Sequence, residues 1–158
     1  MSATTLPECP GIFTLRFARE LLSALGADIS IIRDNWCWAN FREPFSSYQE
    51  KVEAYFANAK TGDPAFAAFC MVYSCGSFRE WAEKIIETSQ IGNPAYSAYR
   101  MVYSCGSSRE WAEKVIEESQ IGNPASAANC MAYYFGSSLE WARKVEQAQK
   151  ARASQSSF

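Results

Sequence analysis

A pattern of 30 residues, written three times between Thr61 and Lys150, most constrains how this chain can fold. The copies begin at Thr61, Ile91 and Ile121, and they read TGDPAFAAFCMVYSCGSFREWAEKIIETSQ, IGNPAYSAYRMVYSCGSSREWAEKVIEESQ and IGNPASAANCMAYYFGSSLEWARKVEQAQK. Self-similarity at a fixed period of this length is typical of supersecondary units that stack on one another. The period therefore predicts an architecture, and it does not by itself predict a biological task.

Each copy begins with the signals of a first helix, which we call helix A. In the second copy, Asn93 is a good N-cap and Pro94 suits the first position of a helix. We expect helix A to run from Pro94 to about Cys105. Gly106 follows, and glycine readily adopts the left-handed conformation that ends a helix.

A capping box predicts a second helix, helix B, in each copy. Ser107 stands three residues before Glu110, so that each side chain can bond the backbone N–H of the other residue. Helix B should then extend to about Ser119, with Gly122 as its stop signal. The same box recurs at 30-residue spacing, at Ser47/Glu50, Ser77/Glu80 and Ser137/Glu140. The first of these boxes indicates that residues 31–60 are a degenerate copy.

Helix B is amphipathic, with a charged ridge that we expect to be solvated. Its apolar face in the second copy consists of Trp111, Ala112, Val115 and Ile116, and we expect this face to be buried. The last copy has Glu146 at the position of Ile116. A charge there is expected only where no further copy covers the helix.

Helix A has two unlike sides. At 100° per residue, one side collects the small residues Ala95, Ala98, Val102 and Cys105, which suit close helix packing. The other side collects larger residues that vary between copies, except for one constant tyrosine per copy. We take this side as the candidate partner-binding surface, with the residues Phe66, Cys70, Tyr73, Tyr96, Arg100, Tyr103, Asn129, Tyr133 and Tyr134.

Two interpretations of the constant tyrosines, Tyr73, Tyr103 and Tyr133, remain open. They can pack between neighbouring helices A as core spacers whose hydroxyls reach water. They can instead form a ladder along an accessible surface, beside a variable row that gives specificity, because Tyr and Arg are favoured at interface hot spots.

The chain before the copies is expected to cap them. Residues 1–11 contain two prolines and few packing groups, so we expect a flexible lead-in. From Ile12 to Leu25 apolar residues recur at a spacing of four, which predicts an amphipathic helix. We prefer a further helix from Asp28 to Phe41, ended by Pro44, over a short strand at residues 29–32, because nothing nearby offers a strand to pair with.

Together these elements predict an all-α single domain. The expected fold is a short right-handed α/α solenoid of about three to four helix-pair repeats with an N-terminal helical cap. Its divisions are the lead-in (1–11), the cap with a degenerate half repeat (12–46), helix B of the degenerate repeat (47–60), three repeats (61–90, 91–120 and 121–150) and a frayed tail (151–158).

Composition argues against several classes of function. The chain has no histidine, no phosphate-binding loop and no metal-spaced cysteine cluster, so we expect no enzymatic activity, cofactor or metal. The formal charge of -2 gives no long-range attraction to nucleic acid. No secretory signal and no apolar run of roughly 20 residues is present, so we expect a cytoplasmic protein that does not enter membranes and keeps its cysteines reduced.

The copies also carry the pattern N/D-P-x-x-x-A … G-x-x-x-E-x-A-E-K-(I/V)-I. Its residues in the first copy are Asp63, Pro64, Ala68, Gly76, Glu80 and residues 82–86. This pattern resembles short helix-pair repeats of phage and bacterial proteins of unknown function, and it is similar in plan to HEAT-like repeats. The resemblance covers residues 61–150. It implies an α-solenoid and a phage or mobile-element origin, and it carries no activity.

The leading hypothesis is a non-catalytic interaction protein that binds another protein through helix A. A phage origin would make it a small inhibitor or adaptor of a host protein. One alternative is binding of single-stranded nucleic acid, with bases stacked on the tyrosines and Arg100 on the backbone, although the low basic content argues against it. Another alternative is self-association through an end face or the aromatic row, which would give a homodimer.

Overall fold

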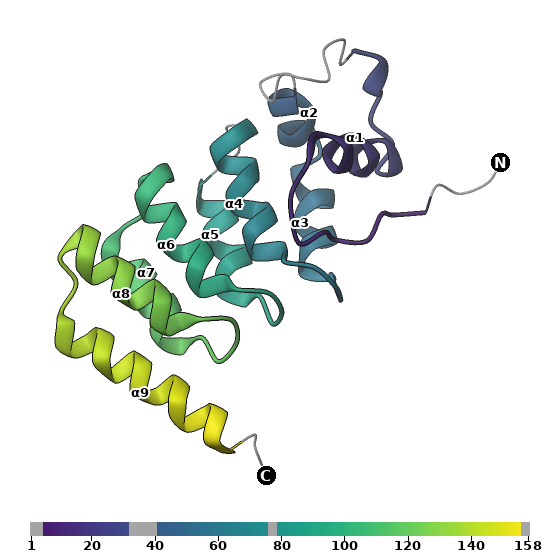
Figure 1. Cartoon of the computed structure of the whole chain (residues 1–158). Coiled ribbons are helices and arrows are strands. Elements are labelled where there is room, and N and C mark those ends of the chain that lie inside the picture. The colour runs from purple at the N-terminus through teal and green to yellow at the C-terminus, as the bar shows by residue number, and fades with distance from the viewer. Residues whose placement is uncertain (1–4, 32–40, 76–78, 156–158) are drawn as a thin grey trace.

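The computed structural model describes residues 5–31, 41–75 and 79–155, and every regular element in these ranges is helical (Figure 1). The elements are α1 (Leu15–Ala24), the 3-10 turn η1 (Ile29–Ile31), α2 (Arg42–Ser47), α3 (Gln49–Ala57), α4 (Pro64–Cys75), α5 (Arg79–Thr88), α6 (Pro94–Cys105), α7 (Arg109–Glu118), α8 (Pro124–Phe135) and α9 (Leu139–Gln155). The fold class is therefore all-α, as predicted. None of the described helices has the length and apolar content that crossing a bilayer requires.

Each sequence copy folds as two helices that pack on each other, α4 with α5, α6 with α7 and α8 with α9. The first helices also contact one another in the order α4, α6, α8, so they form one layer and the second helices form another (Figure 1). Small residues permit this approach, since Ala95 and Ala98 of α6 are fully buried. Val102 and Cys105 of the predicted small face are only half-buried.

The predicted bounds of helix A are confirmed, because each end has its own chemical cause. The Asn93 side chain accepts a hydrogen bond from the Tyr96 N–H at 3.2 Å, and Pro94 begins α6. At the other end Gly106 has a φ of 78°, which only glycine adopts without strain.

The predicted cap of helix B lies one residue too early. The Ser107 N–H donates to the Met101 carbonyl at 3.2 Å, so Ser107 still belongs to the end of α6. Ser108 caps α7 instead, because its hydroxyl accepts from the Trp111 N–H at 3.1 Å. Ser138 caps α9 in the same way.

The other predicted boxes and the region before them also differ from expectation. Ser47 is the last residue of α2 and cannot cap α3, while Ser77 lies outside the described residues. In place of the helix expected from Asp28, only the turn η1 is described, and residues 32–40 lie outside the described ranges. Pro44 is within the first turn of α2, where backbone N–H groups have no intrahelical partner and proline is tolerated.

Residues 5–11 pack against α3 and the start of the first copy instead of forming a flexible lead-in. Pro7 accepts a hydrogen bond from the Tyr55 hydroxyl at 2.6 Å, and Cys9 is buried. The Pro10 carbonyl accepts from the Asp63 N–H at 3.1 Å. The described part of the lead-in is therefore joined to α3 and to the residue that precedes α4.

The N-cap side chains connect the copies, and we call Asp63, Asn93 and Asn123 the Asx ladder. The Asn93 N–H donates to Asp63 Oδ2 at 3.0 Å, and the Asn123 N–H donates to Asn93 Oδ1 at 3.2 Å. Each ladder side chain also caps its own helix. Each ladder side chain thus begins its own helix, and those of Asp63 and Asn93 also bond the next copy.

The last copy ends differently from the others, and α9 continues through residues 151–155 where we expected a frayed tail. Arg152 holds this extension in place by donating to the Ser119 carbonyl at 3.2 Å.

Glu146 is half-exposed and pairs with Lys150 at 3.5 Å, whereas Ile116 is fully buried. The position of Glu146 is therefore uncovered, as predicted.

Candidate functional site

Aromatic side chains of α4, α6 and α8 lie close together. On α4 and α6 they recur three or four residues apart, whereas on α8 they are the consecutive residues 133–135. We call them the aromatic surface, which consists of Phe66, Phe69, Tyr73, Tyr96, Tyr99, Tyr103, Tyr133, Tyr134 and Phe135. The structure thus brings together most of the residues that the sequence predicted for partner binding.

Ring contacts join the three helices. Phe66 of α4 stacks on Tyr96 of α6, with ring centroids 6.3 Å apart and planes inclined by 30°. Tyr103 of α6 meets Tyr134 of α8 edge-on at 5.9 Å, and Tyr134 in turn meets Tyr133 at 4.8 Å. The aromatic surface is therefore continuous across α4, α6 and α8.

The exposed fractions of the side chains separate an accessible layer from a supporting layer. Tyr73, Tyr103 and Tyr133 are 62%, 58% and 82% exposed. Phe69 and Tyr99 lie beneath them at 2% and 8%, and burial raises the pKa of the Tyr99 hydroxyl. The constant tyrosines are consequently exposed and are not core spacers.

Arg100 lies on this surface with its charge held against rings. Its guanidinium carbon is 5.1 Å from the Phe69 ring centroid and 5.9 Å from that of Tyr96, and it donates to the Tyr96 hydroxyl at 2.9 Å. Its Nε is buried without a hydrogen-bond partner among the described residues. No ion pair of Arg100 occurs in that part of the chain, so its positive charge is available to a carboxylate from outside.

The remaining predicted residues have smaller roles in this geometry. Cys70 is half-buried, and burial raises the pKa of its thiol to about 11, an effect that the nearby Arg100 charge opposes. This thiol is protonated at neutral pH and acts as an apolar contact. Asn129 is exposed at the α8 position that corresponds to Tyr99, so the rings are interrupted there.

Sequence reasoning missed Phe69 and Tyr99, the two rings that support the others. Their spacing contains the signal, because residues 66, 69 and 73 and residues 96, 99 and 103 fall on one side of a helix. At 100° per residue these two positions fall between the small side and the large side of helix A, so the sequence assigns them to neither. Their burial follows from packing against α6 and α8.

Comparisons with protein-family models, with curated proteins and with solved structures found no match. No group of three or more potential metal-ligating side chains occurs among the residues that the structure describes. The function is therefore inferred from the geometry of the aromatic surface itself.

Proposed function

We propose that this chain is a non-catalytic protein–protein interaction module that binds a protein partner through the aromatic surface. The observation that carries the proposal is the exposure of Tyr73, Tyr103 and Tyr133, each of which is more than half exposed and packs against another aromatic ring of its own helix. Tyrosine offers a large contact area and has only two side-chain dihedrals to immobilise, which makes it efficient at interfaces.

The scaffold that we propose is a short right-handed α/α solenoid of helix pairs. Its support is the Asx ladder, which joins α4 to α6 and α6 to α8 through the same pair of backbone and side-chain groups. When every unit is connected to the next by the same contact, the units stack in one direction and present one extended surface. The aromatic surface follows that direction.

The contacts of Arg100 indicate what the partner should supply. The Arg100 guanidinium lies on ring faces and is only partly buried, so a carboxylate that reaches its accessible nitrogen forms a strong charge-assisted bond. We expect the partner to place an apolar or aromatic group on the exposed tyrosines and an Asp or Glu beside Arg100. The resemblance to phage helix-pair repeats supports a role as a small inhibitor or adaptor of a host protein.

The test compares the native protein with a triple variant, Tyr73→Ser, Tyr103→Ser and Tyr133→Ser. Both would be tagged and used to capture proteins from the source cell, and a captured protein would be purified and its affinity remeasured. The matched control is Glu80→Gln, Glu110→Gln and Glu140→Gln, on three exposed positions of the second helices. Loss of the partner by the tyrosine variant alone is expected. Capture at full affinity by that variant would overturn the proposal.

Single-stranded nucleic acid is the second candidate, because the exposed rings and Arg100 also suit base stacking. The formal charge of -2 counts against it. Anisotropy of a labelled pyrimidine oligonucleotide, measured at low and high salt, separates the candidates. Binding that weakens steeply with salt and disappears in the tyrosine variant would favour nucleic acid. Light scattering on the same samples would reveal a homodimer.

A further inference from the structure

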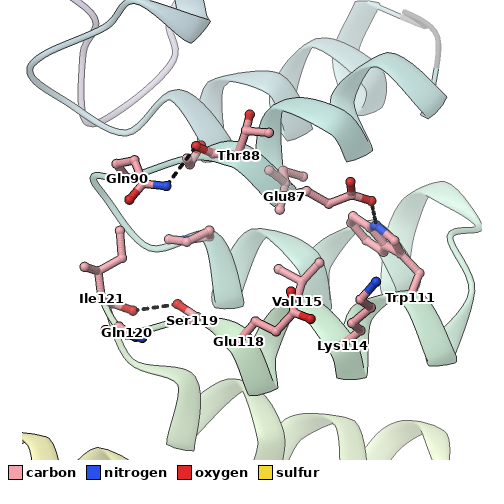
Figure 2. A pocket seen from close by; sticks show the side chains of 13 residues that line it. Glu87, Thr88, Gln90, Trp111, Lys114, Val115, Glu118, Ser119, Gln120 and Ile121 are labelled. Atoms are coloured by element: carbon pink, nitrogen blue, oxygen red, sulfur yellow. Dashed lines mark hydrogen bonds between the residues drawn. The ribbon is translucent and has the colours of Figure 1, made fainter.

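A groove of about 700 Å³ separates α5 from α7, on the layer of second helices (Figure 2). One wall is the last turn of α5 with the residues that follow it, and the other is one side of α7. The charged side chains that line it are Glu87, Lys114 and Glu118. Trp111 closes one end with its indole (Figure 2).

The groove has a negative character. Two carboxylates face one ammonium group, and the carbonyl end of α5 adds the negative end of its helix dipole. Glu87 Oε1 accepts from the Trp111 indole N–H at 2.6 Å, which holds the carboxylate beside an aromatic ring. A carboxylate fixed at the edge of the groove is a good partner for a cation, because a charge-assisted hydrogen bond is stronger than a neutral one.

The groove between α7 and α9 is the same structure one copy later, and it is already filled. Its lining contains Ile116, Glu117, Lys144 and Val145, which correspond to Ile86, Glu87, Lys114 and Val115. It also contains Arg152, and its volume is only about 80 Å³. The Arg152 guanidinium donates to the Ser119 carbonyl at the end of α7, at 3.2 Å.

The two grooves differ because the chain takes a different course after α7 than it does at the equivalent point of α9. α9 extends beyond Lys150 and delivers Arg152, whereas α7 ends at Glu118 and the chain turns at Gly122, the residue that corresponds to Arg152. Ser89, which corresponds to Ser119, lines the α5–α7 groove. Lysine occupies the same sequence position in both grooves. Lys144 pairs with Glu140 at 3.6 Å, and Lys114 has Glu110 at the same i,i+4 spacing, so its side chain can turn the same way to admit an arginine.

We propose that the α5–α7 groove binds an arginine side chain of a protein partner, as the α7–α9 groove binds Arg152. The guanidinium would lie between Glu87 and the carbonyl end of α5, and its aliphatic stem would lie against Ile86 and Val115. This inference rests on the proposed function only in taking the arginine to come from a protein partner.

The test uses N-acetyl-L-arginine amide as the probe and the indole N–H resonance of Trp111 as the reporter in NMR titrations. We expect saturable shifts with this probe and none with N-acetyl-L-citrulline amide, which has the same shape without the charge. Glu87→Gln should weaken binding about tenfold or more, because it removes a charge-assisted bond. Glu117→Gln, the matched change in the filled groove, should leave the Trp111 titration unchanged.

A further variant, Arg152→Ala, makes the test more stringent. It should empty the α7–α9 groove and add a second saturable response, at the backbone N–H of Val145. The variant with Tyr73, Tyr103 and Tyr133 changed to Ser should still bind the probe, so failure of the aromatic surface remains distinguishable from failure of the groove. Equal responses to the arginine and citrulline probes, or no second response in Arg152→Ala, would overturn the proposal.

Discussion

Gly92 lets two copies approach more closely than a residue with a side chain would allow. Its φ is 79°, and a Cβ atom there would overlap the Asp63 carboxyl group. Gly106 has almost the same φ, 78°, but the atom nearest to its Cβ position is an Arg79 nitrogen at 3.5 Å. The two glycines therefore share a backbone conformation and differ in crowding.

Alanine substitutions at these positions separate strain from overlap. Gly106→Ala should lower the free energy of unfolding by about 1–2 kcal/mol, the cost of a left-handed conformation. Gly92→Ala should lower it by more, because the Asx ladder must also open. Urea denaturation followed by circular dichroism measures both. Equal losses would show that the close approach at Gly92 contributes nothing.

Two equivalent tryptophans differ in burial, although the sequence predicts the same buried position for both. Trp81 is 4% exposed, while Trp111 is half-buried with its N–H bonded to Glu87. Trp81→Ala should cost about 3–5 kcal/mol as a core truncation, and Trp111→Ala should cost less. Thermal and urea unfolding would check the order. A larger loss for Trp111→Ala would contradict the burial of these side chains.

Buried thiols give the stability an alkaline limit. Burial raises the pKa of Cys9 from 9.0 to about 11, and it raises that of Cys70 likewise. Well below pH 9.0 both thiols are protonated in the folded and the unfolded chain. Above it the unfolded chain releases protons that the folded chain keeps, so the free energy of unfolding falls as the pH rises toward 11. Urea unfolding on both sides of this range should show a smaller fall in a variant with Cys9→Ala and Cys70→Ala.

At the scale of elements, the sequence predicts helices whose ends carry a side-chain signal. The bounds of α6 follow from Asn93 and Gly106, and both act as expected. The lead-in escaped prediction because Pro7 and Pro10 contribute backbone carbonyls, which every residue possesses and no sequence pattern marks. The position of the α7 cap could not be assigned from the sequence for a related reason, since the adjacent Ser107 and Ser108 carry equivalent hydroxyl groups.

The lead-in should stabilise the first copy locally. Deletion of residues 1–10 removes the Pro10 carbonyl from the Asp63 N–H and uncovers the helices beside it. Amide hydrogen exchange should then accelerate in the first turn of α4 and remain unchanged in α9, because stacked units contact only their neighbours. The comparison uses the full chain as control. Uniform acceleration throughout the chain would indicate a single cooperative unit instead.

For the whole molecule, the sequence predicts the candidate site better than it predicts the groove. The spacing of Tyr73, Tyr103 and Tyr133 places one tyrosine on each first helix, and that suffices to propose a ladder. Whether the rings are exposed depends on the packing of α4, α6 and α8, which one helical wheel cannot show. The α5–α7 groove depends on the separation of two helices, and its significance appears only beside the position of Arg152.

The Asx ladder has a mechanical consequence. Helices α1 and α9 lie at opposite ends of the row, so tension applied through the two ends of the chain acts on every joint in series (Figure 1). The contacts between successive copies contain similar hydrogen bonds, and the last helix pair, α8 with α9, has a neighbouring copy on one side only. A stretched molecule would therefore lengthen in steps of about 100 Å, the extended length of one 30-residue copy, beginning at an end.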